Sequence, residues 1–97
     1  MPVEVSRSGS EWSITLSGTI DIFEAQTLHA TAIEAAARAP AVVVRLGAVE
    51  SLDTSITQVL IALKRALAAD GRALRLEGTP TAVDALWRRG GLDPHRG

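Results

Sequence analysis

The sequence predicts a small α/β fold, in which helices pack on a mixed β-sheet of about four to five strands. Two short segments with alternating apolar and polar residues open the chain and predict a β-hairpin. Helix-like and strand-like apolar patterns then alternate, which favours parallel strands joined by right-handed crossovers. The 97 residues, of which 46% are hydrophobic and 22% charged, suit one folded domain. We therefore expect a single domain over residues 1–92 and a flexible polar tail at 93–97.

The opening hairpin is expected from residues 3–6 and 11–16, joined through a Ser-Gly-Ser turn at 8–10. In its second segment, Trp12 and Ile14 alternate with polar residues, as a strand with one buried face requires.

A first helix should begin after Asp21 and end near Arg38, before Pro40. Its apolar positions recur at helical spacing and are mostly alanine: Ala25, Leu28, Ala32 and Ala36. The β-branched run AVVVRL at 41–46 then predicts a central strand that is covered on both faces.

A second helix is expected over residues 54–69, because Asp53 is a good N-cap and Asp70-Gly71 can end it with a residue that tolerates a positive φ. Residues 73–77 form another strand, and a last helix should run from 79 to about 89.

The second helix can be phased at about 100° per residue. Its apolar ridge should face the core, and this ridge comprises Ile56, Val59, Leu60, Leu63 and Leu67. The opposite side should be exposed, and it carries Thr54, Gln58, Ile61 and Arg65. An exposed isoleucine beside a hydroxyl indicates a docking patch. The alternative is that Thr54 is an ordinary first-turn residue and Ile61 a scattered exposed aliphatic side chain.

Composition and motifs argue against several classes of function. A net charge of −1 provides no basic surface for nucleic acid, and no apolar run approaches the length of a membrane span, so we expect a soluble, cytoplasmic protein. The chain has no cysteine, and His29 and His95 lie in no metal-binding motif, so we expect no metal and no cofactor. Neither a nucleophile elbow nor a phosphate-binding glycine loop is present, so we do not expect an enzyme.

From about residue 16 to 92 the chain resembles the STAS family, the sulfate transporter and anti-sigma factor antagonist domains. The resemblance rests on the apolar strand at 41–46, the sequence Asp53-Thr54-Ser55 opening a helix, and a glycine-bounded strand after that helix. The sequence SGTID at 17–21 is similar to the family's Gly-x-x-Asp loop, and Gly91-Leu92 to its terminal pair. The family fold, a β-sheet with helices on it, agrees with the fold expected above.

The resemblance implies a non-enzymatic switch in bacterial signalling. In the family, the hydroxyl residue directly after the Asp is phosphorylated by a partner kinase, and the phosphate controls docking. That residue here is Thr54, while Ser55 is the weaker candidate because it phases toward a flank with Ala62 and Ala66. The expected docking surface comprises Asp21, Asp53, Thr54, Gln58, Ile61 and Arg65.

Two positions depart from the family pattern. Arg45-Leu46-Gly47 stands where members commonly have Asp-Leu-Ser, and Ile56 stands where they have glycine. Arg45 could pair with Asp21, with Asp53 or with a phosphate on Thr54. Alternatively, it is a solvent-facing arginine at a strand end.

Two functions remain open. In the first, the protein is an anti-sigma factor antagonist-like switch whose partners are an anti-sigma factor or serine/threonine kinase and a phosphatase. In the second, it is a constitutive accessory subunit that docks on the ATPase of a bacterial lipid-transport ABC complex.

Overall fold

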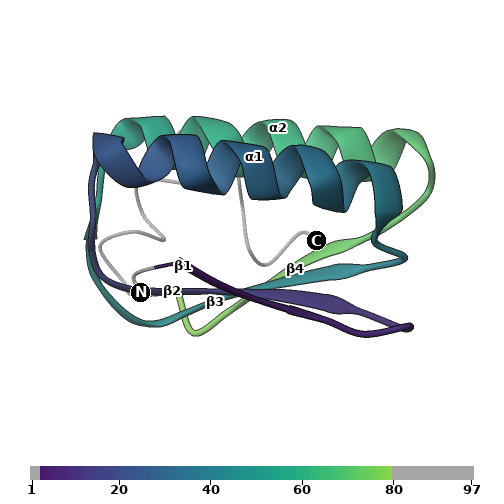
Figure 1. The fold of residues 1–97 in the computed structure, drawn as a ribbon, viewed down its shortest axis with the longest axis horizontal. Helices are drawn as coiled ribbons and strands as arrows, with labels where there is room; N and C mark the ends of the chain where they lie inside the picture. The colour runs from purple at the N-terminus through teal and green to yellow at the C-terminus, as the bar shows by residue number, and fades with distance from the viewer. Residues whose placement is uncertain (1–2, 80–97) are drawn as a thin grey trace.

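The computed structural model describes residues 3–79 of the chain, and these form four strands and two helices (Figure 1). In chain order they are β1 (Val3–Arg7), β2 (Trp12–Ile20), α1 (Ile22–Arg38), β3 (Val42–Leu52), α2 (Thr54–Ala69) and β4 (Leu74–Glu77). The last helix expected from 79 to about 89, and the tail expected at 93–97, lie outside the described residues.

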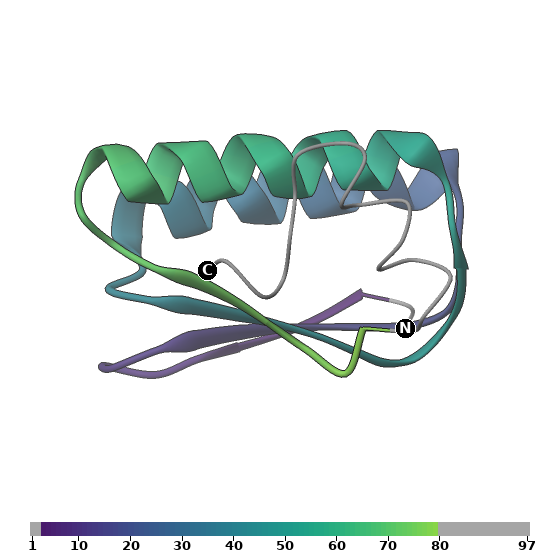
Figure 2. The same cartoon turned by 180° about the vertical axis from the view of Figure 1, so that it is seen from behind.

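The four strands form one mixed sheet in the order β1-β2-β3-β4. The first pair is antiparallel, while β2, β3 and β4 run parallel to one another. Both helices lie side by side on one face of this sheet, as Figures 1 and 2 show from opposite sides. The predicted α/β fold with an opening hairpin and parallel crossovers is therefore confirmed.

The helix bounds agree with prediction, but two strands are longer than predicted. β2 continues from Leu16 to Ile20, and β3 continues from Leu46 to Leu52. Gly18, with a φ of +72°, lies at register shifts in the β2–β3 pairing, so it bends the strand instead of ending it. This extension carries both strands to the points where the helices start.

The core lies between the sheet and the helices. The alternate residues Ile14 and Leu16 of β2 are fully buried, as are Val44 and Leu46 of β3. The helices cover them with Leu28, Ala32 and Ala35 of α1, and with Ile56, Leu60, Leu63 and Leu67 of α2. Ala35 was not in the predicted stripe, and the predicted Ala25, Ala36 and Val59 are only partly buried against this core. Because most contacts from α1 are alanines, this helix can lie close to the sheet.

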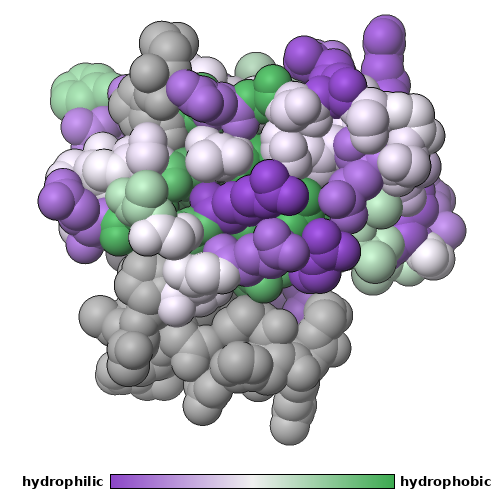
Figure 3. Space-filling model, turned by 90° about the horizontal axis from the view of Figure 1, so that it is seen from below, coloured by the Kyte–Doolittle hydropathy of each residue, from purple (hydrophilic) through white to green (hydrophobic). Residues whose placement is uncertain are grey.

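Hydrophilic side chains lie across the middle of the sheet face away from the helices, with smaller apolar areas between them (Figure 3). Val43 nevertheless has no exposed surface, although it alternates with the core residues Val42 and Val44 and lies outside the core cluster. An ion pair of 3.4 Å between Glu11 and Arg75 spans β3 on this side. The central strand is thus covered on both faces, by helices on one and by charged side chains on the other.

Arg72 ties the end of α1 to the segment that follows α2. Its guanidinium donates hydrogen bonds to the carbonyl oxygens of Ala36 and Ala39 and pairs with Asp70 at 2.6 Å. The last carbonyls of a helix have no partner within the helix, so this side chain satisfies one of them, that of Ala36, and also the carbonyl of the C-cap residue Ala39. Gly71, with a φ of +71°, ends α2 and directs the chain toward this contact.

The Arg72→Met substitution should lower the free energy of unfolding by about 2 kcal/mol, because two carbonyl groups lose a charged donor while the apolar stem is kept. Urea unfolding measures this loss. Arg75→Met is the matched control, since Arg75 forms half-exposed ion pairs of a kind that contribute about 0.5 kcal/mol. Equal losses in the two variants would show that Arg72 is only another surface charge.

Candidate functional site

Both helices begin at the same end of the molecule, on the left in Figure 1. Ile20 and Leu52 are opposite each other where β2 and β3 end, and the Asp53 N–H donates a hydrogen bond of 2.8 Å to the Ile20 carbonyl. The residues that follow, Asp21 and Asp53, therefore start α1 and α2 next to each other. We call this region, residues 17–27 and 47–59, the helix-start end.

Each helix start is capped by an aspartate. Asp21 Oδ1 accepts hydrogen bonds from the N–H groups of Phe23 at 3.0 Å and Glu24 at 3.4 Å. Asp53 Oδ1 accepts from the Ser55 N–H at 2.9 Å and from the Ser55 hydroxyl at 2.8 Å. These two bonds, the one from the backbone first, lower the pKa of Asp53 below its ordinary value of 3.8. The predicted N-cap role of Asp53 is confirmed, and Asp21, which was predicted only to precede the first helix, caps α1 in the same way.

The two candidate hydroxyls differ in what they contact. Ser55 is half-buried and donates its hydroxyl to Asp53. Thr54 is exposed, and its hydroxyl forms no hydrogen bond within residues 3–79. Thr54 is therefore the more accessible of the two residues, and a reaction at the Ser55 hydroxyl would have to break its hydrogen bond to Asp53.

Thr54, Gln58 and Arg65 are exposed along α2, as the phasing predicts. The expectation that Ile61 is exposed is wrong, because only 9% of it is accessible and it belongs to the core cluster. Thr57, one turn earlier on the same flank, is buried as well, with 5% accessible. α2 is therefore buried both toward the sheet and on the flank away from α1, and phasing on one apolar ridge does not show the second buried side.

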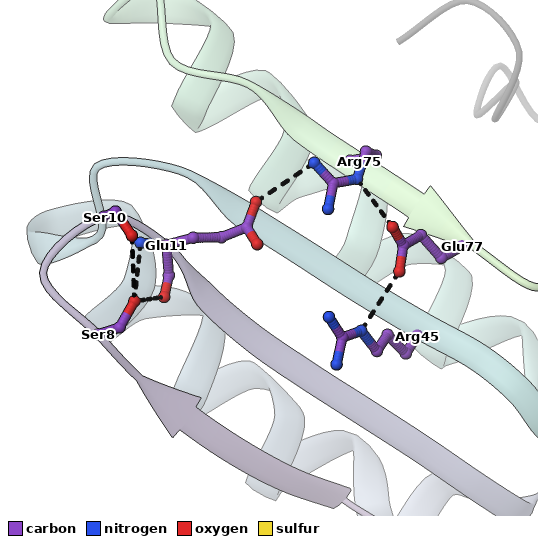
Figure 4. Close-up of polar contacts among 6 residues, drawn as sticks. All are labelled: Ser8, Ser10, Glu11, Arg45, Arg75 and Glu77. Atoms are coloured by element: carbon purple, nitrogen blue, oxygen red, sulfur yellow. Dashed lines mark hydrogen bonds and ion pairs between the residues drawn. The ribbon is translucent and has the colours of Figure 1, made fainter.

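Arg45 contacts neither Asp21 nor Asp53. It lies within β3, opposite Glu77 of β4, and pairs with that carboxylate at 3.3 Å. Glu77 also accepts from Arg75 at 3.0 Å, and Arg75 reaches Glu11 at 3.4 Å, so the charges form a chain across the sheet (Figure 4). The cation at the position where the family has aspartate is thus neutralised by a neighbouring strand.

A shallow apolar groove runs between the two helices, with a volume of about 190 Å³. Its lining is mostly alanine and aliphatic: His29, Ala32, Ile33, Ala36, Val59, Ala62, Leu63 and Ala66. Within residues 3–79, no group of three or more histidine, aspartate or glutamate side chains is arranged to hold a metal ion. Neither α1 nor α2 is long and apolar enough to cross a membrane.

Sequence reasoning did not single out the first turn of α1, where Ile22 and Phe23 are 59% and 81% exposed. These residues lie off the alanine stripe that predicts the helix. One feature of the sequence could have indicated this exposure: Phe23 follows the aspartate at position 21 by two residues and falls on the side of the helix opposite its apolar stripe.

Comparisons with known proteins address both family and fold. The family model described as "Mlab, STAS domain" matches residues 3–94. No curated protein sequence matches the chain. Among solved structures, the anti-sigma factor antagonist SpoIIAA in its unphosphorylated form superposes with a TM-score of 0.84 at 17% identity, over 95% of this chain and 83% of that one.

Two further structures show the same fold. Phosphorylated SpoIIAA, a Bacillus cell fate determinant, has a TM-score of 0.79 at 17% identity, over 93% of this chain and 84% of that one. An anti-sigma factor antagonist from Mycobacterium paratuberculosis has a TM-score of 0.72 at 25% identity, over 95% of this chain and 81% of that one.

The Asp53 cap predicts a pH dependence of stability. Because its pKa is lower in the folded protein than the ordinary 3.8, the ionised cap stabilises the fold above that pH, and this contribution is lost as the pH falls through the lowered value. Asp53→Asn keeps a capping oxygen but does not titrate. Urea unfolding from about pH 2 to 7 should show the wild type more stable near neutrality and the difference shrinking in acid.

Glu4→Gln, which removes an exposed carboxylate from β1, controls for the change in net charge. A constant difference between wild type and Asp53→Asn over the whole pH range would contradict the assigned role of the ionised cap.

Proposed function

Because the chain belongs to the STAS family, we propose that it is a phosphorylation-regulated protein-binding switch that is toggled at Thr54. The observation that carries the proposal is the environment of this residue: an exposed hydroxyl without a hydrogen-bond partner in residues 3–79, at the first turn of α2 and beside the Ser55 hydroxyl that Asp53 holds.

A phosphate on Thr54 is compatible with the fold. It would add about 1.5 to 2 negative charges at a helix N-terminus, where backbone N–H groups and the helix dipole favour an anion. The side chain already projects into solvent, so no core contact has to change. The added group instead enlarges and hydrates the surface next to Asp53, and a partner that packs there has to remove that water.

The docking surface that we propose comprises Asp21, Asp53, Thr54, Gln58 and Arg65. Its members come from the starts of both helices and from the exposed side of α2. Ile61, which the sequence placed in this surface, is left out because its side chain is buried.

The similar structures support this kind of function. SpoIIAA, an anti-sigma factor antagonist, has been solved in unphosphorylated and phosphorylated forms, and both superpose on this chain. We propose partners of the same kind, namely an anti-sigma factor or serine/threonine kinase and a phosphatase. In this proposal the chain is not an enzyme, and it acts on transcription in the bacterial cytoplasm by releasing or capturing its partner.

One observation favours a second function. The matching family model, over residues 3–94, is described as "Mlab, STAS domain" and is thus named for a protein other than the anti-sigma factor antagonists. The chain could accordingly be a constitutive subunit on the ATPase of a lipid-transport ABC complex, using the same start of α2 as a permanent contact. Phosphate on Thr54 distinguishes the two functions, since only the switch requires it.

Thr54→Glu should release the main partner and leave the fold intact, because the new carboxylate points to solvent at a helix N-terminus. Lysate of the source organism is passed over immobilised wild type and variant, and the bound proteins and any phosphate on Thr54 are identified by mass spectrometry. Thr27→Glu is the matched control, since Thr27 is an exposed threonine of α1 beyond its first turn.

Recovery of a kinase or anti-sigma factor by the wild type and Thr27→Glu, but not by Thr54→Glu, is the expected result. Recovery of a transport ATPase with unphosphorylated Thr54 would favour the constitutive subunit. Unfolding of Thr54→Glu would show that Thr54 has a structural role, contrary to its exposure.

A further inference from the structure

We propose that Ile22 and Phe23 are the apolar anchor with which this protein docks on its partner, and that the partner presents an apolar pocket bordered by lysine and arginine. This inference rests on the proposed function for the existence of a partner, and it adds the residues that bind and the chemistry that they require.

The exposure of these two side chains is not explained by the fold. Three large hydrophobic residues among those described are strongly exposed, and two of them are Ile22 and Phe23, at 59% and 81%. The cap of α1 uses the backbone N–H of Phe23 and leaves its ring free. Exposed aromatic side chains with apolar neighbours are typical of the centre of protein interfaces, where one or two anchors supply most of the affinity.

The pair lies at the start of α1, which is held next to the start of α2, where Thr54 lies. The hydrogen bond from the Asp53 N–H to the Ile20 carbonyl fixes the start of α2 against the residues that precede Ile22. Ile22 also lies seven and eleven residues before His29 and Ile33, which line the groove toward α2, so it projects from the flank of α1 that faces α2. A partner that covers Thr54 therefore reaches this pair as well.

The charges around the pair define the partner. The helix-start end carries four carboxylates, on Asp21, Glu24, Glu50 and Asp53, and has no lysine or arginine. A chain with a net charge of −1 thus concentrates negative charge around Phe23, the most exposed aromatic residue among residues 3–79. Complementary charge at the rim of an interface accelerates association and selects partners, so the surface that fits is basic.

The same charges disfavour two other occupants. A symmetric dimer through this patch would bring the two acidic ends together, and an anionic membrane surface would be repelled. A phosphate on Thr54 would in turn be attracted by a basic partner at long range. It would oppose docking at contact, because the water that the phosphate holds at the start of α2 would have to be removed.

Binding measurements on purified protein test the anchor. The protein that wild type captures is purified and titrated calorimetrically with wild type, Phe23→Ala and Ile33→Ala. Ile33 is the matched control, because it is 58% exposed on the same helix, about 15 Å further along it. Phe23→Ala should weaken binding by about 30-fold or more, and Ile33→Ala by less than about 3-fold. Both variants should unfold at the wild-type temperature, because neither side chain is buried.

A charge variant tests the chemistry of the partner. Glu50→Gln should slow association, and raising the salt concentration should slow association of the wild type, since both weaken long-range attraction. Glu4→Gln, on the exposed part of β1, should leave the association rate unchanged. If neither salt nor the Glu50→Gln substitution changes the association rate, the inference that the partner's surface is basic is wrong.

The results separate this inference from the proposed function. If Phe23→Ala binds like wild type while Thr54→Glu is released, the anchor is wrong and the switch stands. If Thr54→Glu binds normally while Phe23→Ala is weakened, the switch is wrong and the anchor stands. If the wild type self-associates and Phe23→Ala does not, the occupant of the patch is a second copy of this chain and the proposal of a basic partner is wrong. If the wild type captures no protein, the proposed docking surface is wrong.

Discussion

The parallel pairing of β2 and β3 is the constraint on which the rest of the structure depends. It ends with Ile20 opposite Leu52 and is extended by the hydrogen bond from the Asp53 N–H to the Ile20 carbonyl. Because a helix follows each of these strands directly, this pairing places the starts of both helices next to each other, at the helix-start end. The caps, the Thr54 hydroxyl and the apolar pair all lie at this helix-start end, and of the proposed docking surface only Arg65 lies further along α2.

The ends of the molecule are therefore chemically different. At the helix-start end, capped N–H groups, four carboxylates and an exposed aromatic ring face solvent. At the other end, Arg72 donates hydrogen bonds to the carbonyl groups at the end of α1. The ion pair between Glu11 and Arg75 covers the side of β3 that faces away from the helices. Strong contacts are thus placed where the fold has to be fixed, and unsatisfied or apolar groups where a partner can use them.

Local signals predicted the helices well. Asp21, Asp53 and Gly71 act on their own neighbours in sequence, so they fix the helix ends without knowledge of the tertiary structure. Non-local contacts could not be predicted in the same way. The continuation of β3 depends on its pairing with β2. Ile61 is buried because α2 is packed on a second side. Arg45 is paired with Glu77, a residue 32 positions away in the sequence. Phe23 was missed because exposure is a property of the folded surface.

The most direct test of the central claim compares the purified partner's affinity for the unphosphorylated protein with its affinity for protein carrying phosphothreonine at position 54, with thermal unfolding of both forms recorded alongside. The account predicts at least a tenfold loss of affinity, about 1.4 kcal/mol, with unchanged unfolding. Equal affinity of the two forms would show that Thr54 is not a switch. A loss of affinity accompanied by unfolding would show that the phosphate acts on the fold and not on the surface.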